Sequence, residues 1–149
     1  MRSLWRWSPA ILWATAIWFL STANFSAPAT SRILVPLLHW LLPQASRETL
    51  ELLHGLIRKA AHFVEFFIFS LLVLRGIRGE RRGWKVAWGL ATVLIAAGYA
   101  ALDEVHQAFV PGRTASPMDS LLDTCGAASA QLLAWVRARG PSGSAGSPA

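Results

Sequence analysis

Two short stretches carry most of the side chains that could do chemistry. RKAAHFVEF (58–66) holds Arg58, His62 and Glu65, and DEVHQAFVPGR (103–113) places two acids, a histidine, a glutamine and an arginine in eleven positions. Guanidinium groups bind phosphate and carboxylate through paired hydrogen bonds, and a histidine beside a carboxylate can move a proton. These residue types therefore favour recognition of an anion, or acid–base chemistry.

Helical phase groups these side chains into stripes, because residues three or four apart share a helix face. Arg58, His62 and Glu65 form the first stripe. The second stripe contains Tyr99, Asp103 and Gln107, with Glu104 and His106 flanking it on opposite sides. The third contains Asp119, Asp123, Gly126 and Ala130, and its last two residues form a small-xxx-small pair that favours close approach of another helix.

The elements that carry these stripes are expected to be membrane helices. Hydrophobic residues make up 54% of the 149 residues and charged residues only 15%, against roughly 25% charged in soluble domains. The net charge is +6, but the arginines lie at the edges of apolar blocks rather than among aromatics, so no nucleic-acid partner is expected. The single cysteine, Cys125, is no basis for a disulfide or a zinc site.

Apolar blocks of near-spanning length predict an all-α fold, an integral membrane bundle of four transmembrane helices. The second block reaches that length only if its helix begins earlier, within 47–59. The four blocks are 9–25, 60–74, 84–109 and 117–136. Between the first two, 32–43 is too short to span and contains Pro36 and Pro43, which indicates a short interfacial or re-entrant segment. The Gly/Ser/Pro-rich tail 139–149 is expected to be disordered.

Basic residues predict the orientation in a bacterial inner membrane. Clusters precede the first block, fill the link 75–85 and follow the fourth block, which places both termini in the cytoplasm and 108–116 outside. Arg2, Arg6 and the APA at 27–29 also imitate a cleaved signal peptide. We favour a retained helix, because the apolar run is long for a signal peptide.

Local patterns predict the connection between the last two blocks. Pro111 and Gly112 suit a type II turn, and Ser116, Pro117 and Asp119 suit the N-cap, N1 and N3 positions of the following helix. Asp119 therefore has two readings of equal weight, as a helix cap and as a site residue.

Adjacent helix positions differ by 100°, so Asp103 and Glu104 cannot both face the centre of the bundle. We expect Asp103 to point inward and Glu104 to lie at the shoulder, reaching Arg113 or headgroups.

Purely structural roles provide the alternative for these charges. Asp103 with Arg58, and Glu65 with Arg113, could be ion pairs that neutralise charge within the bundle. Lys59 suits an interfacial position. His39 and His54 lie outside the stripes and are expected to be interfacial or structural.

The two stretches together resemble the VanZ-like family of bacterial membrane proteins. The family pattern is an R-K-x-x-H-F-x-E-[YF] helix followed by D-E-x-[HY]-Q-x-F-x-P-x-R and a later aspartate, which here is Asp119. The resemblance covers roughly 8–138, which it identifies as a VanZ-like transmembrane domain, and 26–53 carries no motif. The family's namesake is associated with teicoplanin resistance, so the resemblance implies a role in glycopeptide resistance or envelope maintenance.

We expect an outward-facing polar pocket that binds a membrane lipid, a lipid-linked envelope intermediate or a lipoglycopeptide, without cofactor or metal. The oligomeric state stays open, an oligomer included. The expected ligand-binding residues are Arg58, Lys59, His62, Glu65, Asp103, Glu104, Gln107, Arg113 and Asp119.

The alternative is an intramembrane hydrolase, in which His62, Glu65, Asp103 and His106 are the catalytic candidates and a metal could activate water. We favour binding over catalysis, because nearby basic residues disfavour a divalent cation. A transporter is less favoured, because no inverted repeat is visible.

Overall fold

The computed structural model describes residues 2–139, and this part of the chain is helical throughout, without strands. Its elements are α1 (Arg2–Leu20), η1 (Ala23–Phe25), α2 (Ala27–Leu41), α3 (Arg47–Arg78), α4 (Val86–Ala108) and α5 (Pro117–Arg139). The all-α prediction is confirmed. The predicted disordered tail, apart from Arg139, lies outside the described residues.

Two of these helices, α3 and α4, are long and apolar enough to cross a membrane. A third span results if Leu4–Leu20 and Ala23–Leu41 are counted together, although the two are bent by 72° at the break. The composition of α5 falls short, because polar residues such as Asp119, Asp123 and Gln131 lower its mean hydropathy. Among the described residues, two or three of the four expected spans are therefore present by length and composition.

Helix bounds near the N-terminus differ from the prediction. The first helix ends at Leu20 rather than near residue 25, and a short 3-10 turn separates it from α2. The segment expected to be broken at Pro36 is instead part of one 15-residue helix. Pro36 lies on the exposed side of this helix, and the helix continues through it despite the missing backbone hydrogen bond and the steric conflict with the Arg32 carbonyl.

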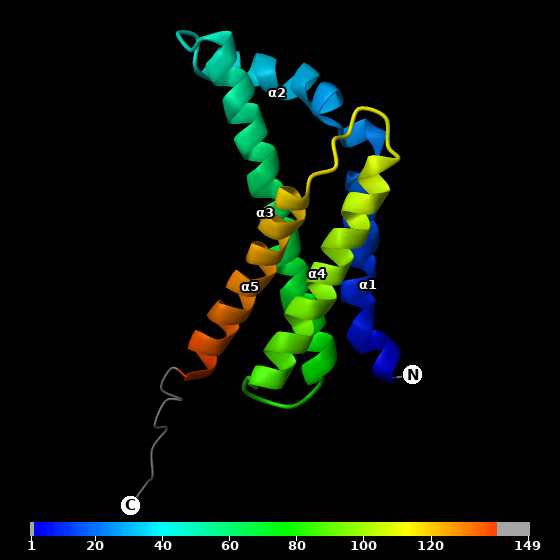
Figure 1. The fold of residues 1–149 in the computed structure, drawn as a ribbon. Helices are drawn as coiled ribbons and strands as arrows, with labels where there is room; N and C mark the ends of the chain where they lie inside the picture. Colours follow the sequence, from blue (N-terminus) through cyan, green and yellow to red (C-terminus); the bar gives the residue numbers. More distant parts are fainter. Residues whose placement is uncertain (1, 140–149) are drawn as a thin grey trace, which may run out of the picture.

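The second apolar block does begin earlier, as predicted. Ser46 caps α3 by accepting a hydrogen bond from the Thr49 backbone at 3.2 Å. With 32 residues, α3 is about 48 Å long and extends beyond the rest of the bundle toward α2, which lies across that end (Figure 1). His54 is buried there and contacts Thr30 at 3.0 Å, which confirms its structural role and joins α2 to α3.

The core of the bundle lies where α1, α3, α4 and α5 meet. Phe66, Phe69 and Val73 of α3 pack against Ala96, Ala100 and Ala127. Gly126 lies so close to the Phe63 carbonyl of α3 that any larger side chain would collide with that backbone. The small-xxx-small prediction for α5 is confirmed, and α5 can therefore bring its polar stripe against α3.

The connection between α4 and α5 follows the sequence closely. The Arg113 backbone donates to the Val110 carbonyl at 3.2 Å, and Gly112 between them has a positive φ of 76°. Only glycine adopts that φ at no steric cost, as the type II turn requires. Pro117 begins α5 as predicted. The turn brings the Arg113 backbone back over the end of the bundle.

Candidate functional site

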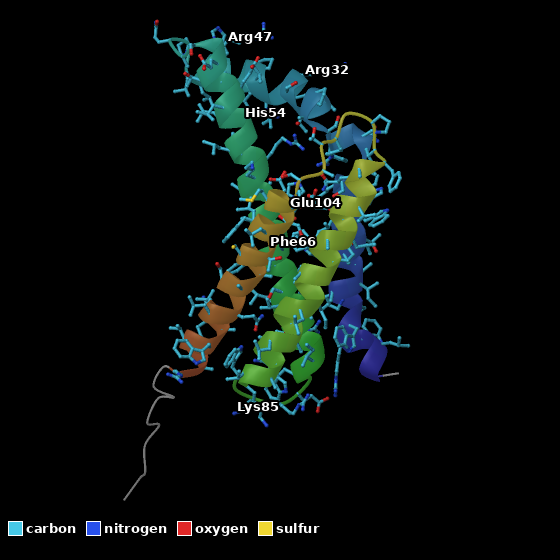
Figure 2. All side chains as sticks on the ribbon, in the orientation of Figure 1. Arg32, Arg47, His54, Phe66, Lys85 and Glu104 are labelled. Atoms are coloured by element: carbon cyan, nitrogen blue, oxygen red, sulfur yellow. The ribbon has the colours of Figure 1, made fainter. Side chains whose placement is uncertain are left out.

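A polar cleft of about 190 Å³ lies beneath α2, where α3, α4, α5 and the loop 109–116 meet. Figure 2 shows Glu104 near the end of the bundle that carries the polar cleft, with Phe66 deeper in the bundle. Seven of the nine residues predicted to bind a ligand line it: Arg58, Lys59, His62, Glu104, Gln107, Arg113 and Asp119. Three helices and one loop thus bring together residues that are up to 61 positions apart in the chain (58 to 119).

An apolar groove of about 220 Å³ lies beside the polar cleft and shares Arg58, His62 and Arg113 with it. The rest of its lining is mostly apolar and comes from α1, η1, α2 and α3: Leu20, Phe25, Thr30, Leu34, Ile57, Ala61 and Glu65. The three shared residues therefore stand between a polar and an apolar compartment.

Asp103 lies below the cleft and is fully buried, as predicted. One of its oxygens, Oδ2, accepts hydrogen bonds from Ser21 Oγ at 2.7 Å and from Gln107 Nε2 at 2.8 Å. The Tyr99 hydroxyl on the same stripe donates to the Ala14 carbonyl at 2.6 Å. This stripe of α4 is thus turned toward α1 as well as toward α3.

Glu104 lines the polar cleft, but it is buried rather than partly exposed and forms no ion pair with Arg113, so that part of the prediction is wrong. It is 9% exposed, and its Oε2 accepts a hydrogen bond from the Ser116 backbone at 2.6 Å. In a capping box this N–H is bound by the residue at N3, which is Asp119 here. Glu104 of α4 takes over that function, and Asp119 pairs with Lys59 at 3.0 Å.

The two ion pairs of the purely structural alternative do not form. Neither Asp103 with Arg58 nor Glu65 with Arg113 comes within 4.0 Å, and within residues 2–139 neither arginine has a carboxylate partner. Arg113 instead donates to the Leu20 carbonyl and to Gln107 Oε1 at 3.5 Å. Burial, and then the positive charge of Arg58, lower the pKa of Arg113. An anion between the two arginines would offset both effects.

His62 lies between two carboxylates. Its Nδ1 is 3.8 Å from Glu65 Oε2 and 3.9 Å from Asp123 Oδ1, distances that are too long for hydrogen bonds. Asp123 is 1% exposed, and it was not among the predicted site residues. Its place on the stripe of Asp119 was the signal that could have identified it.

His106 lies outside the site. Its ring stacks on Trp18 of α1, with centroids 3.9 Å apart and planes 9° from parallel. The metal-dependent alternative requires the two histidine–carboxylate pairs to face each other. They do not, because the His106 ring is stacked against α1. In the described residues, no group of three or more His, Cys, Asp or Glu side chains is arranged to hold a metal ion.

Buried polar atoms without a hydrogen-bond partner concentrate at this site. Eight such side-chain atoms occur in the described residues, and six belong to His62, Glu65, Asp103, Arg113 and Asp123. Native proteins leave few such atoms unpartnered, and those that remain need an explanation. The site thus presents cationic donors at its mouth and carboxylate acceptors at its floor.

Comparison with known proteins identifies one family. No curated protein and no solved structure is significantly similar to the chain. The model of the VanZ/LLP1 family matches residues 7–138, which include both chemical stretches and every helix that lines the site. The chain therefore belongs to the VanZ/LLP1 family, as the resemblance of its two motifs predicted.

Proposed function

We propose that this VanZ-family membrane protein binds an anionic, amphipathic ligand of the cell envelope, either a lipid-linked intermediate or a lipoglycopeptide. The observation that carries the proposal is the sharing of Arg58, His62 and Arg113 between the polar cleft and the apolar groove. A ligand that occupied both would need a charged head joined to an apolar chain. An envelope role would be compatible with a contribution to teicoplanin resistance.

The head of such a ligand would lie between Arg58 and Arg113. The planar guanidinium fork suits phosphate and carboxylate oxygens, and neither arginine has a carboxylate partner in the described part of the chain. Lys59 and Asp119, paired at the rim, would contribute to selectivity. Gln107 would bind head-group oxygens or amides at the side of Arg113.

The apolar chain of the ligand would lie in the groove under α2. Leu34 of α2 and Ile57 of α3 are among the apolar residues that line it. On its other face α2 leaves Ile33, Leu37 and Trp40 exposed, which suits a helix lying in the membrane interface. A lipid could then enter the groove sideways from the outer leaflet.

The proposal includes a topology of four crossings, by α1, α3, α4 and α5, with both termini in the cytoplasm of a bacterial inner membrane. The start of α1, the loop 79–85 and the end of α5 lie at the same end of the molecule (Figure 1). That end carries most of the arginines, which the positive-inside rule places in the cytoplasm.

Single cysteines in a Cys125→Ala background test the topology. Thr114 and Arg82 are both exposed, one at each end of the bundle. A cysteine in place of Thr114 should react with an impermeant thiol reagent in intact cells, and one in place of Arg82 should react only after lysis. The opposite pattern would place the polar cleft in the cytoplasm and overturn an envelope ligand.

Direct binding tests the ligand class. Farnesyl phosphate and teicoplanin serve as probes for the detergent-solubilised protein, and farnesol, which lacks the phosphate, serves as the control for the head. We expect Arg58→Gln and Arg113→Gln to weaken farnesyl phosphate binding by about tenfold or more each, as the loss of a charge-assisted contact does. Arg82→Gln, on the exposed loop, should leave it unchanged. Equal binding of farnesol and farnesyl phosphate would contradict the anionic head.

A second candidate function is hydrolysis of a lipid-linked substrate, which the position of His62 between Glu65 and Asp123 favours. A histidine oriented by carboxylates can act as a general base, and such contacts often tighten only when substrate binds. Phosphate release from farnesyl phosphate, measured with metal analysis of the same sample, distinguishes the two functions. Release that disappears in His62→Gln would favour the hydrolase.

A further inference from the structure

A second cleft, of about 330 Å³, lies at the opposite end of the bundle from the polar cleft. There α3 and α5 diverge toward their C-terminal ends (Figure 1). Arg75, Arg78 and Arg137 line it together with Trp84, and leucines such as Leu71 and Leu133 form its apolar walls. We call it the arginine cleft.

The acidic residues at this end do not neutralise the three arginines. Glu80 is the only acid in 66–102 and 124–139, and it pairs with Arg6 at 2.8 Å. Arg81 lies over the Trp88 ring at 4.7 Å, and Arg139 lies over Trp135 at 4.1 Å. Within residues 2–139 no ion pair or ring contact of this kind involves the three arginines of the arginine cleft.

Helix capping does not account for these arginines either. Basic side chains near a helix C-terminus often bind the last free carbonyls. In α3 that function belongs to Arg81, which donates to the carbonyls of Ile77 and Arg78. The Nε of Arg78 is buried and has no hydrogen-bond partner in the described part of the protein. The donors of the cleft are therefore available to a ligand.

We propose that the arginine cleft binds the phosphate group of an anionic phospholipid, with the acyl chains against the leucine walls. Basic pockets between membrane helices bind anionic lipid headgroups in this way. Three guanidinium groups supply the donors, and the apolar walls favour a lipid over a free phosphate ion. The site shares no residue with the polar cleft, so it does not rest on the function proposed above.

Thermal unfolding of the full chain in detergent tests the proposal, with dioleoyl phosphatidylglycerol, dioleoyl phosphatidylcholine or sodium phosphate added. We expect phosphatidylglycerol to raise the melting temperature more than phosphatidylcholine does. Sodium phosphate at the same concentration should have no effect. Full stabilisation by sodium phosphate alone would overturn the lipid assignment.

Matched variants test whether the stabilisation by phosphatidylglycerol arises at the arginine cleft. The triple variant Arg75→Gln, Arg78→Gln, Arg137→Gln should lose the difference between the two lipids, and Arg82→Gln should keep it. If the triple variant does not fold, Arg137→Gln alone should weaken phosphatidylglycerol binding severalfold in native mass spectrometry. Wild-type lipid preference in the triple variant, or in Arg137→Gln where the triple variant does not fold, would overturn the site.

Discussion

Two buried polar clusters lie between α3 and α5. The first contains Ser70 and Gln131, and the second contains His62, Glu65 and Asp123. Measured along α3 from residue 70 to residue 62, they are about 12 Å apart. In the first, Ser70 donates to the Ala127 carbonyl at 2.9 Å and accepts from Gln131 at 2.9 Å, while Gln131 accepts from Trp84. In the second, four side-chain atoms have no hydrogen-bond partner among the described residues.

The difference separates a structural polar network from a site. Buried polar groups that are fully satisfied stabilise helix packing, whereas partly satisfied ones lower stability. The second cluster lies at the floor of the site, and its unpaired polar atoms lower the folding free energy of the chain. We infer that this loss of stability is tolerated because the cluster is needed for ligand binding. The variants below test this inference, from the largest expected effect to the smallest.

Asp103→Ala should have the largest effect, because Asp103 is the fully buried acceptor for both Ser21 and Gln107. Ser21 would then lose its acceptor, and Gln107 would keep only a long contact to Ser21 at 3.5 Å, at a cost of about 3 kcal/mol in total. We expect a lower folding yield, a lower melting temperature and weaker ligand binding. The control is Leu102→Ala, at an exposed position of the same helix. Wild-type monodispersity of Asp103→Ala in size-exclusion chromatography would contradict the assignment.

Glu104→Ala should come next, because its carboxylate binds the Ser116 backbone at the start of α5. Loss of a hydrogen bond to a charged group costs about 2 kcal/mol. Glu104→Gln, which keeps an acceptor oxygen, should lose less. The melting temperatures of the two variants test this role. An unchanged value for Glu104→Ala would show that the contact with Ser116 does not stabilise the start of α5.

Arg113→Lys keeps the positive charge but loses the planar fork. We expect farnesyl phosphate binding about tenfold weaker, equivalent to about 1.4 kcal/mol, with normal membrane levels. The conservative control is Arg82→Lys on the exposed loop. Binding equal to the wild type would leave Arg113 with a plain charge role rather than paired hydrogen bonds.

Asp123→Asn and Ser70→Ala should each change the melting temperature only slightly, and the two changes should differ in sign. Asp123 is a buried carboxylate whose two oxygens have no hydrogen-bond partner in the described residues, so removal of its charge should leave the melting temperature unchanged or raise it. Ser70→Ala breaks two hydrogen bonds of the satisfied network and should cost about 1 kcal/mol. A lower melting temperature for Asp123→Asn than for Ser70→Ala would remove the distinction between the clusters.

Sequence alone determined the features that depend on neighbours along the chain. The early start of α3, the turn at Gly112 and the start of α5 at Pro117 follow from local sequence preferences, and all three are present. The stripes of α3, α4 and α5 follow from helical phase. Four of the seven predicted binding residues that line the polar cleft lie on these stripes: Arg58, His62, Gln107 and Asp119.

Tertiary structure decided which neighbour each stripe meets. Helical phase gives the angle between two side chains on one helix, but not the rotation of that helix against the others or the distance between them. Glu104 therefore binds Ser116, His106 stacks on Trp18, and Asp123 joins the site, although none of these partners can be read from spacing. The close approach of Gly126 to the Phe63 carbonyl sets the separation of α3 and α5 and thereby brings Asp123 to His62.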